Sequence, residues 1–153
     1  MKLSEDNIRH TAETIATVFG VGYVAFAPGT IGTLFGVLIY LLIKSVSPAV
    51  YAVIFIVIFV IGIVSSDIVE KTFGEKDPSF VVIDEVAAFL VVMFLVPYSF
   101  LALLLGFVIF RILDIIKPPP INYLERMEGG FGIMIDDIAC GLIVNIFLQI
   151  LFG

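Results

Sequence analysis

The sequence predicts an all-α fold: a polytopic helical membrane protein with about five short transmembrane or partial helices plus an N-terminal interfacial helix. Hydrophobic residues make up 61% of the 153 residues, and the mean hydropathy is +1.19, both far above the values usual for a soluble protein. Long apolar runs recur along the chain, and the charged residues lie mainly between them. The length is that of one domain, so we expect a single domain over residues 1–153.

The charge balance limits the partners of such a protein. The 14 acidic and 8 basic residues give a net charge of −6, which disfavours nucleic acid as a partner. An anionic substrate would need a metal ion or local cations, and a divalent cation would meet that need. The single cysteine, Cys140, excludes an intramolecular disulfide. The N-terminus lacks an immediate apolar core with a small-residue cleavage site, so we expect no signal peptide.

The N-terminal third of the chain predicts an interfacial helix followed by a helical hairpin. Residues 5–19 place apolar side chains three and four apart, which is typical of a short amphipathic helix in the membrane interface. Two apolar runs, 31–43 and 48–65, are separated only by a short polar turn and predict two crossings of the bilayer. The charged residues that follow predict a helical extension into water with a mild ion pair. They are Asp67, Glu70 and Lys71.

Residues 28–33, P-G-T-I-G-T, interrupt the apolar sequence before the first predicted crossing. A helix beginning near Thr30 would direct free backbone N–H groups at an anion, which makes Thr30 and Thr33 candidates for phosphate binding. An ordinary helix start with a threonine cap explains the same residues, and from the glycines alone it is the simpler interpretation.

Three carboxylates, Asp77, Asp84 and Glu85, are concentrated just before the next apolar run. Adjacent carboxylates at a helix start can be caps that complement the helix dipole, worth about 0.3–1 kcal/mol. They can equally hold magnesium, whose preference for hard oxygen ligands suits carboxylates. Both interpretations stay open at this point.

Residues 86–110 carry no charge and are interrupted by Pro97-Tyr98-Ser99. A single kinked helix of this length would rise about 37 Å and cross once, whereas two short helices turning at Pro97 would form a second hairpin. With the hairpin, all 14 acids and all but one of the 8 basic residues lie on one face, which the positive-inside rule makes cytoplasmic. We therefore predict the hairpin, followed by a last crossing over residues 133–152.

Two cations precede the proline block 118–120. Arg111, Asp114 and Lys117 are three residues apart, on one face of a helix that ends at these prolines. Arg111 can clamp a phosphate through two hydrogen bonds, Lys117 can supply a point charge, and Asp114 can orient one of them or join a metal shell. A salt-bridged helix end is the alternative interpretation.

Four carboxylates are predicted to converge. Glycines at 129, 130 and 132 permit a tight turn before Asp136-Asp137, at the entrance of the last apolar run. This pair would face Asp84-Glu85 if both helices start on the same side of the membrane. Because four carboxylates repel one another unless cations intervene, their convergence predicts a bound metal.

Four blocks of sequence carry a resemblance to a known family. They are P-G-T-I-G-T-L at 28–34, D-P-S-F-V-V-I-D-E at 77–85, F-R-I-L-D-I-I-K-P-P-P-I at 110–121 and G-G-F-G-I-M-I-D-D-I-A-C-G at 129–141. In this order they resemble the phosphatidylglycerophosphatase A family of bacterial membrane phosphatases. The resemblance implies an all-helical fold and magnesium-dependent hydrolysis of phosphatidylglycerophosphate to phosphatidylglycerol, at the cytoplasmic leaflet of the inner membrane. Ala87-Ala88 and Thr33 depart from the family pattern but remove no carboxylate.

The residues also limit the mechanism. No arginine follows Cys140 six residues on, the only histidine, His10, lies near the N-terminus, and no D-x-D-x-T motif is present. These facts argue against the cysteine, phosphohistidine and common aspartyl-phosphate routes. Attack on phosphorus by metal-activated water is the favoured route, and an unconventional carboxylate nucleophile is the alternative.

On this hypothesis magnesium is held by four residues, and the phosphate by four others. The metal ligands are Asp84, Glu85, Asp136 and Asp137; the phosphate-binding residues are Arg111, Lys117, Thr30 and Thr33; the catalytic set adds Asp77 and Asp114 to the four metal ligands. Asp77 is either a further ligand or a general acid or base. Two rival classes remain: a small transporter or channel subunit with a carboxylate ion site, and a membrane protein that only assembles with partners.

Overall fold

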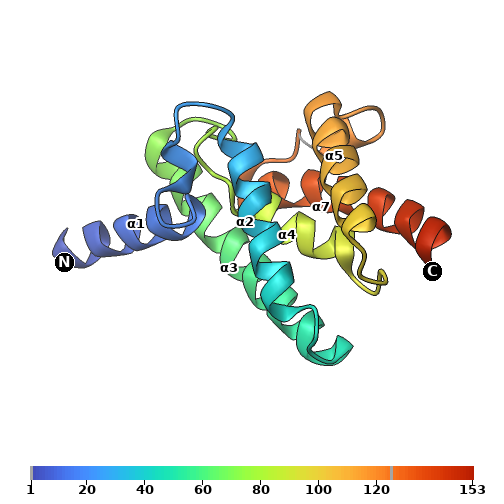
Figure 1. The fold of residues 1–153 in the computed structure, drawn as a ribbon. Helices are drawn as coiled ribbons and strands as arrows, with labels where there is room; N and C mark the ends of the chain where they lie inside the picture. The colour runs from blue at the N-terminus through green and yellow to red at the C-terminus, as the bar shows by residue number, and fades with distance from the viewer. Residues whose placement is uncertain (1, 125) are drawn as a thin grey trace.

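The computed structural model describes residues 2–124 and 126–153, and within them every regular element is helical (Figure 1). The all-α prediction is therefore confirmed. The elements are α1 (Lys2–Ala16), the 3-10 helix η1 (Val21–Tyr23), α2 (Pro28–Ile43), α3 (Pro48–Phe73), α4 (Ile83–Met93), α5 (Phe100–Ile116), α6 (Ile121–Leu124) and α7 (Gly129–Phe152).

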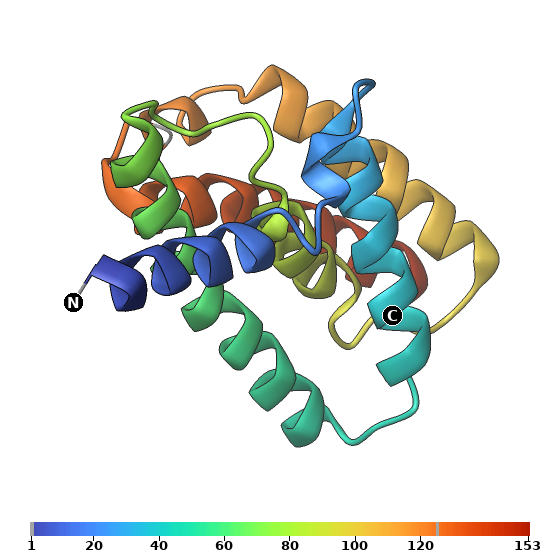
Figure 2. The same cartoon turned by 90° about the vertical axis from the view of Figure 1, so that its left-hand side faces the viewer.

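Helix α4 is the centre of the molecule. All 11 of its residues are buried, and it packs against α2, α3, α5 and α7, which surround it in both views (Figures 1 and 2). At 1.5 Å per residue it rises only about 16 Å, roughly half the hydrocarbon thickness of a bilayer. It is a partial helix, and the carboxylates near its first residue are enclosed by its neighbours.

The hairpin predicted over residues 86–110 is confirmed. Helix α4 ends at Met93, and α5 begins at Phe100 with Ser99 as its N-cap, whose Oγ accepts a hydrogen bond from the Ala102 amide at 3.0 Å. The Nζ of Lys44 lies 3.4 Å from the centroid of the Tyr98 ring, so the turn after α2 and the turn after α4 lie at the same end of the molecule. A single kinked helix is excluded.

Within residues 2–124 and 126–153, two helices are long and apolar enough to cross a bilayer, α3 with 26 residues and α7 with 24. Only 22% of the apolar window of α3 is buried inside the protein. Its outer face exposes branched aliphatic side chains along its length, including Val53, Ile56, Val57, Val60 and Val64. Exposing such a continuous apolar surface to water is costly, so this face indicates membrane association.

The first helix differs from its predicted span of 5–19, because α1 ends at Ala16. Val18 and Phe19 adopt left-handed backbone conformations, with φ of 50° and 57°, and therefore cannot continue a right-handed helix. The Ala16 carbonyl instead accepts a hydrogen bond from the Val82 amide at 2.9 Å. The end of α1 is thereby tied to the segment that leads into α4.

The buried end of α4 requires polar partners, because its last carbonyls have no partner within the helix. The Asn145 side chain on α7 supplies them: its Nδ2 donates to the carbonyls of Val92 at 3.0 Å and Phe94 at 2.8 Å. Gln149 Nε2 donates in turn to Asn145 Oδ1 at 2.8 Å. This network holds α4 at a defined depth against α7.

We expect Asn145→Leu to lower the free energy of unfolding by about 1–3 kcal/mol, because the buried Val92 carbonyl loses its donor and the half-buried Phe94 carbonyl keeps only the longer contact with Gln149. Thermal unfolding in detergent measures the change. Gln149→Leu is the matched control and should cost less, since Gln149 meets the Phe94 carbonyl only at 3.4 Å. Equal stability of Asn145→Leu and the parent would show that α4 does not depend on this contact.

Candidate active site

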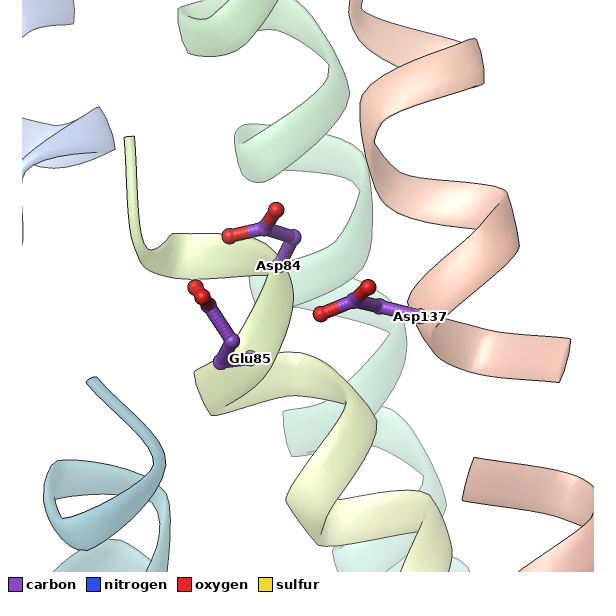
Figure 3. A group of neighbouring side chains, drawn as sticks. All are labelled: Asp84, Glu85 and Asp137. Carbon is purple, nitrogen blue, oxygen red and sulfur yellow. The ribbon is translucent and has the colours of Figure 1, made fainter. Parts of the chain in front are cut away.

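Three buried carboxylates converge between α4 and α7. Asp84 and Glu85 lie in the first turn of α4, and Asp137 lies about two turns into α7. One oxygen of each lies within 4.8 Å of the others, and Figure 3 shows the three side chains directed toward one another. Their exposed fractions are 7%, 9% and 1%.

A side-chain capping bond does not explain Asp84 and Glu85, although both lie in the first turn of α4, where a carboxylate complements the helix dipole. The N-cap of α4 is Val82, which makes no side-chain capping bond. Asp84 Oδ1, Glu85 Oε2 and Asp137 Oδ2 are buried, and none has a hydrogen-bond partner among residues 2–124 and 126–153. Leaving three anionic oxygens buried without donors is costly, so the cluster is suited to a cation. The donor set, three carboxylates, fits the hard oxygen preference of magnesium.

Arg111 joins α5 to this cluster. Its Nη1 donates to Asp114 Oδ2 at 2.5 Å and to Thr33 Oγ1 at 3.4 Å, and it lies 3.6 Å from Glu85 Oε1. The arginine side chain is 14% exposed. One guanidinium thus contacts α2, α4 and its own helix at the edge of the carboxylate cluster.

Lys117 is the C-cap of α5 and lies beside Asp136 and Asp137 of α7. Its Nζ is 2.5 Å from Asp136 Oδ2, 3.6 Å from Asp137 Oδ1 and 3.7 Å from Asp114 Oδ1. Burial lowers the pKa of Lys117, but the charges of Asp137 and Asp136 outweigh it, so the pKa lies above its usual value. Lys117 is therefore a permanent cation in this site.

The four predicted metal ligands do not share one position. Asp136 is outside the group formed by Asp84, Glu85 and Asp137, and its carboxylate is engaged by Lys117 instead. The surrounding charges still require a cation. Five carboxylates (Asp84, Glu85, Asp114, Asp136 and Asp137) face two cations (Arg111 and Lys117), which leaves a formal charge of −3 when all are ionised.

The expectations for the start of α2 need correction. The helix begins at Pro28 with Ala27 as N-cap, so no threonine caps it. The Thr30 amide donates to the Ala27 carbonyl at 3.0 Å and is not free for an anion. Among the described residues the Thr30 side chain has no hydrogen bond, whereas Thr33 is buried and contacts Arg111. The structure thus brings Thr33, but not Thr30, into contact with the charged cluster.

The glycines of α2 serve a role that the sequence did not reveal. A Cβ built on Gly29 would lie 2.2 Å from Glu85 Oε1 and 3.0 Å from Arg111 Nη2. A Cβ on Gly32 would lie 2.8 Å from Val82 Cβ. Both glycines allow α2 to approach the start of α4 closely. In the sequence, Pro28-Gly29 indicates a helix start, and no local pattern indicates the packing of Gly29 against Glu85.

We expect Gly29→Ala to lower activity more than stability. The added methyl group meets the mobile ends of Glu85 and Arg111 rather than backbone atoms, so the fold can adapt while both charged groups move. Displacement of the Glu85 and Arg111 side chains by about 1 Å should reduce kcat/KM by about ten- to a hundredfold. Phosphate-release kinetics beside thermal unfolding measure the two effects. Gly36→Ala, which crowds Phe89 instead, is the control.

The last predicted crossing begins earlier than residue 133. Helix α7 starts at Gly129, so the glycines form its first turn and Asp136-Asp137 lie inside the helix. A Cβ on Gly130 would lie 1.9 Å from the Ile63 carbonyl oxygen, so α7 packs directly on the α3 backbone. Glu70, predicted to face water, instead accepts a hydrogen bond from the Gly129 amide at 3.4 Å. The predicted pair of Lys71 with Asp67 is present at 2.6 Å.

Asp77 lies in the loop before α4, with a left-handed φ of 48°. It is not a member of the three-carboxylate group, although its charge acts on Asp84. It lines a separate polar hollow with Lys76, Asn122 and Arg126. The structure therefore places Asp77 beside the cluster rather than within it.

Comparison with known proteins identifies one family to which this chain is similar. The family model for phosphatidylglycerophosphatase A matches residues 14–152. The phosphatidylglycerophosphatase A of Escherichia coli (strain K12) is 35% identical over 131 residues, covering 84% of this chain and 76% of the relative. That of Haemophilus influenzae is 32% identical over 143 residues, covering 92% and 88%. A Bacteroides thetaiotaomicron protein provisionally named as a phosphatidylinositol-3-phosphatase is 33% identical over 136 residues, covering 84% and 85%. No solved structure matches.

The chain belongs to the phosphatidylglycerophosphatase A family and is a phosphatase. This membership decides between the classes that the sequence left open. An enzyme is supported, rather than a transporter subunit or a protein that only assembles with partners.

Proposed function

We propose that this protein hydrolyses the terminal phosphomonoester of phosphatidylglycerophosphate to phosphatidylglycerol and phosphate, with magnesium, at the cytoplasmic leaflet. One observation carries the proposal: three buried carboxylates, each with an oxygen that has no hydrogen-bond partner in the described part of the chain, lie beside the cations Arg111 and Lys117. The family supplies the substrate class. The carboxylate group supplies the reason to expect a divalent ion.

Asp84, Glu85 and Asp137 would hold the magnesium ion. When bound, the ion supplies Lewis-acid polarisation of the phosphoryl group and lowers the pKa of water. The structure suits it because the three carboxylates present oxygens that no donor satisfies among the described residues.

The cations of the chain bind the phosphate in this proposal. Arg111 offers a planar set of donors to two phosphoryl oxygens, and Lys117 offers a point charge that can stabilise the leaving oxygen. Asp114 orients Arg111 through its 2.5 Å contact. Asp136 holds Lys117 in place and so acts on the phosphate through that lysine. The enclosing helices α2, α5 and α7 limit the entry of bulk water.

Phosphate release from purified protein in detergent tests the proposal. We expect release from phosphatidylglycerophosphate with magnesium and none with excess chelator. Phosphatidylinositol 3-phosphate is the comparison substrate, because one relative carries that name. Hydrolysis of phosphatidylinositol 3-phosphate but not of phosphatidylglycerophosphate would reject the proposed substrate. Phosphate release at the same rate with and without chelator would reject the proposed magnesium dependence.

The leaflet assignment predicts the side on which each loop lies. A tag inserted after Glu75, between α3 and α4, should report the cytoplasm, and a tag at Ser47, between α2 and α3, should report the opposite side. Accessibility of the tags to a membrane-impermeant reagent in intact cells measures this. Labelling of the tag after Glu75, together with protection of the tag at Ser47, would place the active site on the side of the membrane away from the cytoplasm.

A further inference from the structure

A polar hollow of about 460 Å³ lies beside the carboxylate cluster, and the proposed chemistry does not use it. It is lined by Lys76 and Asp77 of the α3–α4 loop, by Asn122 of α6 and by Arg126. Its volume is within the roughly 300–1,000 Å³ range of small-molecule sites. Figure 2 shows the loop that leads into α4 passing beside the short helix α6.

The polar groups of this hollow are suited to an anion that also carries a hydroxyl group. Within residues 2–124 and 126–153, no ion pair engages Lys76 or Arg126. The guanidinium of Arg126 lies 5.3 Å from the Tyr123 ring centroid, which limits its freedom. Asn122 Oδ1 is buried and has no hydrogen-bond partner in the same part of the chain. Two cations, the Asp77 carboxylate and one orphan acceptor therefore line one hollow, and the formal charge of these side chains is +1.

The residues that line the hollow are close in sequence to the reacting groups. Asp77 is seven residues before Asp84 and acts on it electrostatically. Asn122 is five residues after Lys117, and the proline block and Ile121 lie between them.

We propose that this hollow binds the phosphodiester of the lipid headgroup while the terminal phosphomonoester lies at Arg111 and Lys117. The inference rests on the proposed function, because it needs a substrate with two phosphates joined by glycerol. Lys76 and Arg126 hold the diester charge, and Asn122 accepts a hydrogen bond from the free glycerol hydroxyl. These residues then distinguish a glycerophosphate headgroup from a lipid whose single phosphate is the reacting one.

The test is the kinetics of full-length variants on phosphatidylglycerophosphate in mixed micelles, with inorganic phosphate as competitive inhibitor. We expect the double variant Lys76→Ala, Arg126→Ala to raise KM about tenfold and to leave kcat within twofold, because it loses two charge-assisted contacts made in the ground state. The inhibition constant of inorganic phosphate should stay unchanged, since that ion binds at the reacting position. Lys76→Arg on its own should stay near the parent.

Lys71→Ala is the matched control. Lys71 is an exposed cation near the same loop, paired with Asp67 at 2.6 Å and outside the hollow. An equal rise in KM for Lys71→Ala would mean general attraction to anionic micelles and would overturn the proposal. An unchanged KM in the double variant would also overturn it, as would a parallel rise in the inhibition constant of phosphate. Failure of the parent to hydrolyse the lipid would instead reject the proposed function.

Discussion

Replacing Asp137 with asparagine is expected to lower turnover by about a hundredfold or more without unfolding the protein. The amide keeps the size of the side chain and removes a charge from the group formed with Asp84 and Glu85. Loss of residues that only support metal ligands costs about 10- to 100-fold, so loss of a ligand should cost at least as much. Asp84→Asn and Glu85→Gln should behave in the same way.

Magnesium titrations and thermal unfolding in chelator test this prediction together. The activity of Asp137→Asn should require more magnesium, while its melting temperature in chelator should be no lower than that of the parent, because one like charge leaves a repulsive cluster. Asp136→Asn is the matched control. Its carboxylate is held by Lys117, so it should raise KM for the lipid more than the magnesium requirement. Near-normal turnover of Asp137→Asn at limiting magnesium would reject the metal site.

The fold followed from the sequence wherever the bilayer and the charges constrain the chain. Pro97 by itself is compatible with one kinked helix and with a helical hairpin. The distribution of charged residues favours the hairpin, which the structure contains. The depth of α4 could not be predicted in the same way. It depends on Asn145, a single polar residue in an apolar run, whose partners are carbonyls some 50 residues away in the chain.

The candidate site was predictable in its composition but not in its geometry. Asp136 and Asp137 are equivalent in sequence, yet successive residues of a helix point about 100° apart. The rotation of α7 about its axis therefore sends one carboxylate toward Asp84 and the other toward Lys117. That rotation follows from the contact of Gly130 with the α3 backbone, which no local pattern reveals.

Arg111→Ala is expected to reduce kcat/KM by about a thousandfold, more than Lys117→Ala. The guanidinium contacts Asp114, Thr33 and Glu85 from one position, so its loss removes the phosphate clamp. Among the described residues it leaves Asp114 with only Lys117, at 3.7 Å, as a cationic partner. Arg111→Lys should recover little of the loss. An ammonium group cannot present two parallel donors to a phosphate while keeping the contact with Asp114.

The magnesium requirement separates a role on the phosphate from a role in supporting the carboxylates. Arg111 lies 3.6 Å from Glu85, so its removal exposes the metal group to stronger mutual repulsion but removes no oxygen ligand. The site that the divalent magnesium ion enters is then more negative than in the parent, which favours binding of the ion. Half-maximal activity should therefore need no more magnesium than in the parent. KM for the lipid should rise in the same experiment. Full activity of Arg111→Lys, or a shift mainly in the magnesium requirement, would make Arg111 a support of Glu85 and Asp114 rather than a ligand of the substrate.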